Sequence, residues 1–137
     1  RMVTPTLAGT RPGGAISSAW AVMNYLGIDG YRQKQQSVTR ARASIEVGVS
    51  EMGFEVLGAP KLGIMAFSHP ELDIFALYKR LYERGWVTSL CTQPKALHLM
   101  LSPFHETVAA QYLADLTWAV AQVRAGINDA VTEVRYS

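Results

Sequence analysis

The residues best suited to bind an anion lie near the start of the chain, between Thr4 and Gly14. Small, turn-forming and cationic residues gather there, directly before an apolar pattern of helical period. The first turn of a helix has free backbone N–H groups and the positive end of the helix dipole, so it favours an anion. Thr10 would either cap this helix or offer its hydroxyl to an oxyanion. A capped turn without a ligand remains the simpler alternative, since neither GxxxxGKS/T nor GxGxxG is present.

His98 is the second residue whose position suggests chemistry. It lies in a segment, residues 96–101, in which aliphatic residues alternate with other residue types. This alternation predicts a strand with one aliphatic face, while the opposite face carries His98. The aliphatic positions are Leu97, Leu99 and Leu101. An ordinary strand histidine on a polar face is the alternative interpretation.

The other histidines and the lone cysteine do not predict a further site. His69 and His105 adjoin Pro70 and Glu106 at expected loop ends, so we interpret them as turn or capping residues. The three histidines and Cys91 lack metal-ligand spacing, and we therefore predict no metal site. The three tryptophans are expected in the core or in an interface.

Hydrophobic periodicity predicts the elements that must position these residues. A first helix starts near Ala15 and is broken at Gly27–Gly30, and a second, longer helix continues to about Met52. We expect Ile16, Ala19, Trp20 and Met23 to form a buried stripe of the first helix, and Tyr31, Val38, Ile45, Val49 and Met52 to form that of the second.

The remaining elements form a small sheet with further helices. Strands are expected at 54–57, 62–67, 86–90 and 96–101, and the first two are close enough for an antiparallel hairpin. Asp73 would cap an intervening helix that Gly85 ends, and a last helix begins at about Glu106. The sum is an α+β arrangement: two leading helices, then a small, mostly antiparallel sheet with helices.

Composition excludes several classes of protein. The chain has 137 residues, 49% of them hydrophobic, which is enough for one domain with a core. A net charge of +2 gives no argument for nucleic-acid binding, and no apolar run is long enough to span a bilayer. The single cysteine fits a reducing compartment, so we expect a cytoplasmic protein. The sequence leaves open whether a membrane anchor precedes this segment, because the chain begins at Arg1 and not at a methionine.

The loop of residues 4–14 resembles that of the sphingosine-1-phosphate lyases and related group II decarboxylases, which depend on pyridoxal phosphate. The similarity continues through segments 19–21, 26–31, 73–75, 84–86 and 97–99, and so covers nearly the whole chain. The matching part corresponds only to the carboxy-terminal third of the chains in that family. The resemblance implies the small carboxy-terminal domain of an aspartate-aminotransferase-like (fold type I) enzyme, with residues 1–27 as phosphate loop and first helix and residues 28–137 as the small domain.

The resemblance also implies roles for three residues. Thr10 would bind the phosphate of pyridoxal 5'-phosphate held by the partner subunit of a homodimer, and Gly9 would let the backbone approach. His98 would lie next to the small-molecule substrate. Arg11 would pair either with phosphate or with an acidic side chain, and we favour the latter. None of the four lysines follows a histidine, as the Schiff-base lysine of the family does, so we expect no catalytic residue in this segment and place that lysine upstream.

Three functions follow from these observations. The first is a part of a carbon–carbon lyase that cleaves a phosphorylated long-chain base into a fatty aldehyde and phosphoethanolamine, with the rest of the subunit as partner. The second is an amino-acid decarboxylase of the tyrosine, aspartate or glutamate type. The third is a non-catalytic α+β interaction module.

Overall fold

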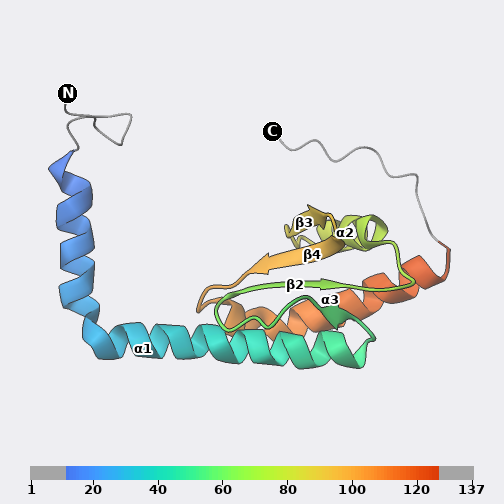
Figure 1. Ribbon diagram of the computed structural model, residues 1–137, viewed down its shortest axis with the longest axis horizontal. Coiled ribbons are helices and arrows are strands. Elements are labelled where there is room, and N and C mark those ends of the chain that lie inside the picture. Colours follow the sequence, from blue (N-terminus) through green and yellow to red (C-terminus); the bar gives the residue numbers. More distant parts are fainter. Residues whose placement is uncertain (1–11, 127–137) are drawn as a thin grey trace. The chain divides into compact units, whose positions relative to one another are not determined.

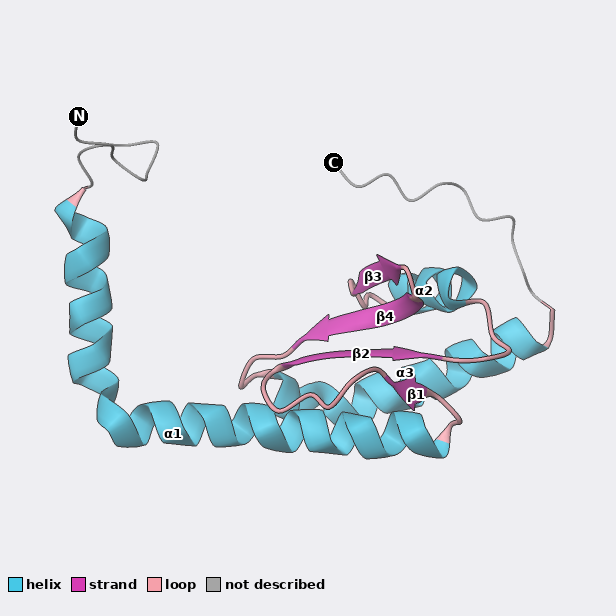
Figure 2. Cartoon of the chain, viewed as in Figure 1, coloured by secondary structure: helices cyan, strands magenta, loops and turns pink. Residues whose placement is uncertain are grey.

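The computed structural model describes residues 12–126. Contacts divide the chain into two compact units, Arg1–Lys34 and Gln35–Ser137, and each is described by itself below. The elements, drawn in Figures 1 and 2, are α1 (Gly13–Glu51), β1 (Glu55–Val56), β2 (Ile64–Ser68), α2 (Ile74–Glu83), β3 (Ser89–Thr92), β4 (Lys95–Met100) and α3 (His105–Arg124).

The helix α1 is interrupted at one residue, Gly27. Its backbone angles, φ 59° and ψ −174°, are not helical, so two helices meet at this position. A positive φ costs a residue with a side chain about 1–2 kcal/mol, whereas glycine adopts it freely. The predicted break between two leading helices is therefore confirmed, but helix resumes directly after Gly27 instead of after Gly30.

In the first unit, the predicted burial of the leading helix is wrong. Ile16 and Trp20 are each 65% exposed, and Met23 is 53% exposed. These three side chains do share a face, as the spacing predicts, and together with Ala15 and Ala19 they line a shallow apolar groove. Helical period determines that they share this face, but burial needs a second surface packed against it. Tyr31, expected to be buried, is also exposed.

In the second unit, the same periodicity produces a buried face. Val38, Ile45 and Val49 are buried, and Met52 is partly buried against the core. Gly48 marks a close approach of α1 to α3, because a Cβ at this position would lie 2.6 Å from the side chain of Leu113. The predicted inner face of this part of α1 is confirmed.

The sheet of the second unit has four strands in the order β1-β2-β4-β3, and every neighbouring pair is antiparallel. The predicted hairpin of the first two strands is confirmed by the pairs Glu55 with Ser68 and Val56 with Phe67. The third strand begins at Ser89, three residues later than the sequence pattern predicts.

The core lies against one face of this sheet. Met65 pairs with Leu99 and Phe67 with Leu97, so these four buried side chains project from the same face. All three helices pack apolar residues against them: Ile45 and Val49 from α1; Ile74, Ala76, Leu77 and Leu81 from α2; Ala109, Tyr112, Leu116, Ala119, Val120 and Val123 from α3. The α+β arrangement with helices on one side of the sheet is confirmed.

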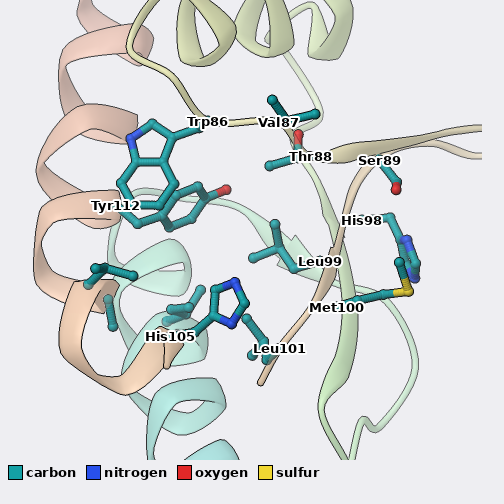
Figure 3. A pocket seen from close by; sticks show the side chains of 13 residues that line it. Trp86, Val87, Thr88, Ser89, His98, Leu99, Met100, Leu101, His105 and Tyr112 are labelled. Carbon is teal, nitrogen blue, oxygen red and sulfur yellow. The ribbon is translucent and has the colours of Figure 1, made fainter. Parts of the chain in front are cut away.

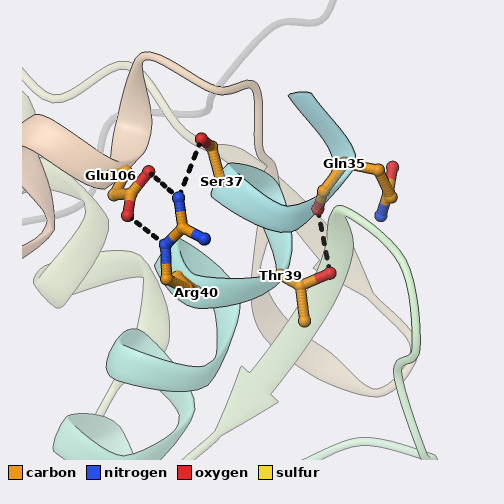
Figure 4. Close-up of polar contacts among 5 residues, drawn as sticks. All are labelled: Gln35, Ser37, Thr39, Arg40 and Glu106. Carbon is orange, nitrogen blue, oxygen red and sulfur yellow. Dashed lines mark hydrogen bonds and ion pairs between the residues drawn. The ribbon is translucent and has the colours of Figure 1, made fainter. Parts of the chain in front are cut away.

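Local polar contacts position the helix ends of this unit. The Asp73 carboxylate accepts a 3.0 Å hydrogen bond from the Phe75 N–H, which confirms the predicted cap of α2. At the start of α3, Arg40 from α1 donates to both carboxylate oxygens of Glu106, at 2.5 and 3.2 Å (Figure 4). The Arg40 guanidinium also contacts the Ser37 hydroxyl at 3.2 Å. The hydrogen bonding of Arg40 to the Glu106 carboxylate lowers the pKa of Glu106 and so favours the charged pair.

Candidate functional site

His98 lies in the centre of the sheet, on the face opposite the core. Its register partners are Ala66 on β2 and Ser89 on β3, both small residues that leave room above the imidazole. Leu97 and Leu99, on either side of it, are buried, while His98 is half-buried. The predicted alternation is therefore confirmed, and Figure 3 shows the ring on the far side of β4 from Leu99.

The surface around His98 includes exposed apolar side chains. Ile64 and Met100 pair across β2 and β4 and are 58% and 66% exposed. An exposed apolar patch next to a hydrogen-bonding group is typical of a ligand or protein contact. The arrangement can donate or accept one hydrogen bond at the imidazole and can bury an apolar group beside it.

The other predicted binding residues lie outside the part that the structure describes. Gly9, Thr10 and Arg11 precede residue 12, and their roles remain predictions.

His69 and His105 have the local roles that the sequence indicates. Nδ1 of His69 accepts hydrogen bonds from the N–H groups of Glu71 and Leu72, at 3.1 and 3.2 Å. Nδ1 of His105 accepts from the Ser102 N–H at 2.8 Å. Both histidines thus close turns that precede helices. Among residues 12–126, no three His, Cys, Asp or Glu side chains lie close enough to hold a metal ion.

The lysines of the chain are peripheral. Lys34, Lys61 and Lys95 are exposed, and Lys79 is half-buried on α2. Lys95 lies with its Nζ 5.2 Å from the centre of the Phe75 ring. None of the four lines the cavity that Figure 3 shows.

The buried acid Asp115, which the sequence analysis did not identify, fixes the approach of α3 to the loop before β3. Its carboxylate accepts hydrogen bonds from Trp86 Nε1 at 2.9 Å and from the Gln111 side chain at 3.1 Å. Arg84 Nη1 lies 3.6 Å from Asp115 Oδ1. The central carbon of the Arg84 guanidinium lies 4.0 Å from the centre of the Trp118 ring. The hydrogen bond from Trp86, followed by that from Gln111, lowers the pKa of Asp115. The sequence does contain a hint of this buried acid, because Asp115 follows Tyr112 by three residues and so shares an otherwise apolar face of the helix.

A small cavity lies on the core side of β4, between this strand and α3. Its volume is about 130 Å³, and Trp86, Leu99, His105 and Tyr112 are among its lining residues. Sequence reasoning did not find this cavity, because its walls come from four separate segments of the chain.

The comparisons with known proteins agree with the resemblance found in the sequence. No family model matches the chain. Over 124 residues, it is 36% identical to the sphingosine-1-phosphate lyase of Arabidopsis thaliana, a match that covers 90% of this chain and 23% of the relative. The solved structure of the Burkholderia pseudomallei sphingosine-1-phosphate lyase aligns with a TM-score of 0.82 and 29% identity, over 90% of this chain and 29% of that one. The chain is a homologue of sphingosine-1-phosphate lyases.

The chain is also similar to group II decarboxylases. Over 98 residues it is 34% identical to a probable L-tyrosine/L-aspartate decarboxylase of Methanothermobacter thermautotrophicus, covering 72% of the chain and 27% of the relative. The chain spans about a quarter of the length of the curated relatives it matches. Its fold is the small α+β carboxy-terminal domain of these enzymes. No helix within residues 12–126 is long and apolar enough to cross a membrane.

Proposed function

We propose that this chain is the carboxy-terminal domain of a pyridoxal-phosphate-dependent carbon–carbon lyase. Its substrate would be a phosphorylated long-chain base, cleaved to a fatty aldehyde and phosphoethanolamine. The observation that carries the proposal is the agreement of sequence and structure: 36% identity to a plant sphingosine-1-phosphate lyase and a TM-score of 0.82 to a bacterial one, each over 90% of the chain.

The described residues do not by themselves form a cofactor site. Pyridoxal phosphate, when bound, supplies an aldehyde and an electron-withdrawing ring, and it needs a lysine for attachment. The lysines of this chain lie at the surface or half-buried on α2, away from the cavity, so we place the attachment lysine in the upstream part of the subunit. The contribution of this chain would be Thr10, whose hydroxyl binds the cofactor phosphate, with Gly9 leaving space for the backbone.

His98 would act at the substrate side of the same site. An imidazole on the uncovered sheet face can form a hydrogen bond to a polar group of the substrate. Ile64 and Met100 beside it offer exposed apolar surface to the carbon chain of that substrate. His98 would therefore orient the substrate, and we assign it no bond-breaking step.

A homodimer is part of this proposal. A phosphate ligand that comes from the neighbouring subunit requires two copies. The first helix supports the homodimer, because its apolar face, with Ile16, Trp20 and Met23, is exposed. Exposing apolar surface to water costs free energy, which a contact with a second subunit would remove. We place this face in the contact between subunits.

The role of Thr10 is tested by Thr10→Ala in the intact enzyme. Loss of a hydrogen bond to a charged phosphate should weaken cofactor binding by about 1.5–3 kcal/mol, or roughly 10- to 150-fold. Cofactor affinity is measured by titrating the apoenzyme and following cofactor absorbance. Thr6→Ala, in the same loop, is the matched control and should bind normally. Unchanged affinity in Thr10→Ala would show that the phosphate is held elsewhere.

The amino-acid decarboxylase is the second candidate, favoured by the 34% identity to the archaeal relative. Both enzymes would share fold and cofactor and differ in the substrate. The intact enzyme should be offered a sphingoid-base phosphate and a panel of tyrosine, aspartate and glutamate. Aldehyde formation from the phosphorylated base supports the lyase, whereas release of carbon dioxide without an aldehyde would exclude it.

The interaction module is tested by borohydride treatment followed by intact-mass measurement. Borohydride reduces the bond between cofactor and lysine to a stable one. A subunit or second fragment that carries the added cofactor mass supports the enzyme. A single unmodified species near 15.0 kDa would instead indicate a domain that works without cofactor.

A further inference from the structure

The cavity between β4 and α3 has a composition that suits a ligand. Most of its wall is apolar, formed by Ile45, Trp86, Leu99, Leu101, Val108 and Ala109. Its volume is about 130 Å³. Val87, at its edge, is 79% exposed, so the cavity communicates with solvent there. A molecule can therefore enter without unfolding the core.

Two hydroxyl groups of this wall are buried and have no hydrogen-bond partner in the described part of the chain. They are Tyr112 Oη and Thr88 Oγ1. Tyr112 is only 3% exposed, and Figure 3 shows its hydroxyl directed from α3 toward Leu99 and Thr88. A buried polar group without a partner costs about 1–3 kcal/mol. Two such groups at one cavity indicate that something else satisfies them.

Water alone does not suit this space. At about 30 Å³ per molecule the cavity would hold roughly four waters, and each needs two to four polar partners. Of the other polar lining residues, Ser89 points to the His98 side of the sheet and His105 Nδ1 already accepts from Ser102, so the wall offers few of these contacts. A single molecule with an apolar body and one hydroxyl would instead fill the volume, donate to one hydroxyl and accept from the other.

We propose that this cavity binds a small uncharged molecule that combines an apolar body about the size of a benzene ring with one hydroxyl group. The Trp86 ring, which meets Tyr112 edge-on at 5.1 Å, supplies a flat wall for such a body. Burial raises the pKa of Tyr112, and the same low-dielectric surroundings disfavour a charged ligand.

This site differs from the one proposed for the substrate, although His98 and Met100 are among the residues that border both. The ring of His98 lies on the other side of β4 from Tyr112 (Figure 3). Ligand binding beside Tyr112 and substrate binding beside His98 would therefore occupy opposite faces of one strand. The proposal holds whichever enzyme the subunit belongs to.

The test uses phenol, benzene and benzoate as probes of the intact protein, with binding followed by saturation-transfer NMR of the ligand. Phenol should bind, benzene should bind roughly 30-fold more weakly because it lacks both hydrogen bonds, and benzoate should not bind because of its charge. Tyr112→Phe keeps the packing but lacks the hydroxyl, so it should weaken phenol about fivefold and leave benzene unchanged. Tyr82→Phe, at an exposed tyrosine on α2, is the matched control.

Ala109→Leu adds bulk to the cavity wall and should abolish binding of phenol and benzene. Absence of phenol binding at millimolar concentration would overturn the proposal and leave ordered water as the partner of both hydroxyls. Equal phenol binding to wild type and Tyr112→Phe would overturn it too, because the ligand would then lie elsewhere. The Tyr112→Phe comparison decides the matter even where Ala109→Leu does not fold.

Discussion

Two stretches of α1 carry the same apolar spacing and differ in what covers it. In the first unit Ile16, Trp20 and Met23 are more than half exposed, whereas Val38 and Val49 in the second unit are buried. A period of 3.6 residues determines which side chains share a face. Burial depends on whether another surface packs against that face. An apolar stripe therefore predicts that a partner exists, without saying in which chain.

The second unit provides its own partner surface. Its inner sheet face packs against residues of α1, α2 and α3, and the largest fully buried side chains, Phe67, Met65 and Leu77, meet there. The first unit has an apolar groove instead. We expect the second unit to unfold as a cooperative core and the first helix to depend on the rest of a larger protein.

Phe67→Ala should have the largest effect on this contrast. The side chain is fully buried and contacts Phe54 edge-on, with ring centroids 5.3 Å apart. Removing a buried phenylalanine side chain costs about 3–5 kcal/mol of unfolding free energy. Urea unfolding followed by circular dichroism measures it. Phe104→Ala, at a phenylalanine that is 67% exposed, is the control and should change stability by less than about 0.5 kcal/mol. Equal losses in the two variants would mean that the described core is not the stabilising one.

Asp115→Asn should have an intermediate, pH-dependent effect. The pKa of Asp115 is lowered in the folded protein, chiefly by the hydrogen bond from Trp86. A lowered pKa adds stability above the unfolded value of about 3.9, and this stability is lost as the pH falls through the folded value. At pH 7 the variant should lose about 1–2 kcal/mol, since asparagine keeps an acceptor but not the charge.

Unfolding curves at neutral pH and near pH 3 test this prediction. The gap between wild type and Asp115→Asn should narrow in acid, because the carboxylate of the unfolded wild-type chain takes up a proton at a higher pH than that of the folded protein. Asp29→Asn, at a carboxylate of the first unit whose side chain is 89% exposed, should show no such gap at either pH. A gap that stays constant with pH would rule out the ionic contribution of Asp115.

Trp20→Ala should change the stability of the second unit least. Because the side chain is 65% exposed, the loss should stay below about 0.5 kcal/mol. In the intact enzyme the same change should weaken the dimer by about 2 kcal/mol or more, roughly 30-fold, if Trp20 lies centrally in the subunit contact. Sedimentation equilibrium measures this. Tyr25→Ala, at a residue that is 89% exposed on the same helix, is the comparison. A dimer unaffected by Trp20→Ala would remove the first helix from the contact.

The elements of the fold follow from local features of the sequence. Asp73 caps α2 because its short carboxylate reaches the Phe75 N–H, and Gly27 breaks the leading helix because it adopts a positive φ. Period-2 alternation around His98 predicts which face of β4 is aliphatic. The sequence pattern starts β3 three residues too early, because the apolar residues Trp86 and Val87 belong to the loop before this strand.

The candidate site was predictable only in part. The position of His98 on an uncovered face follows from alternation along one strand. The cavity beside Tyr112 does not, because Thr88, Tyr112 and Ile45 come from a loop and two helices far apart in the sequence. Nothing in the local spacing of Tyr112 indicates that its hydroxyl lacks a partner.

By itself, the sequence determined the order of helices and strands, where helices are capped or broken, and which side chains share a face. These properties depend on backbone sterics and on hydrogen bonds between near neighbours. Only the tertiary structure decided which faces are buried, that Asp115 accepts a hydrogen bond from Trp86 Nε1, and that two hydroxyls without a partner line one apolar cavity. Burial and hydrogen-bond satisfaction depend on segments distant in the chain, and no local pattern records which of these come together.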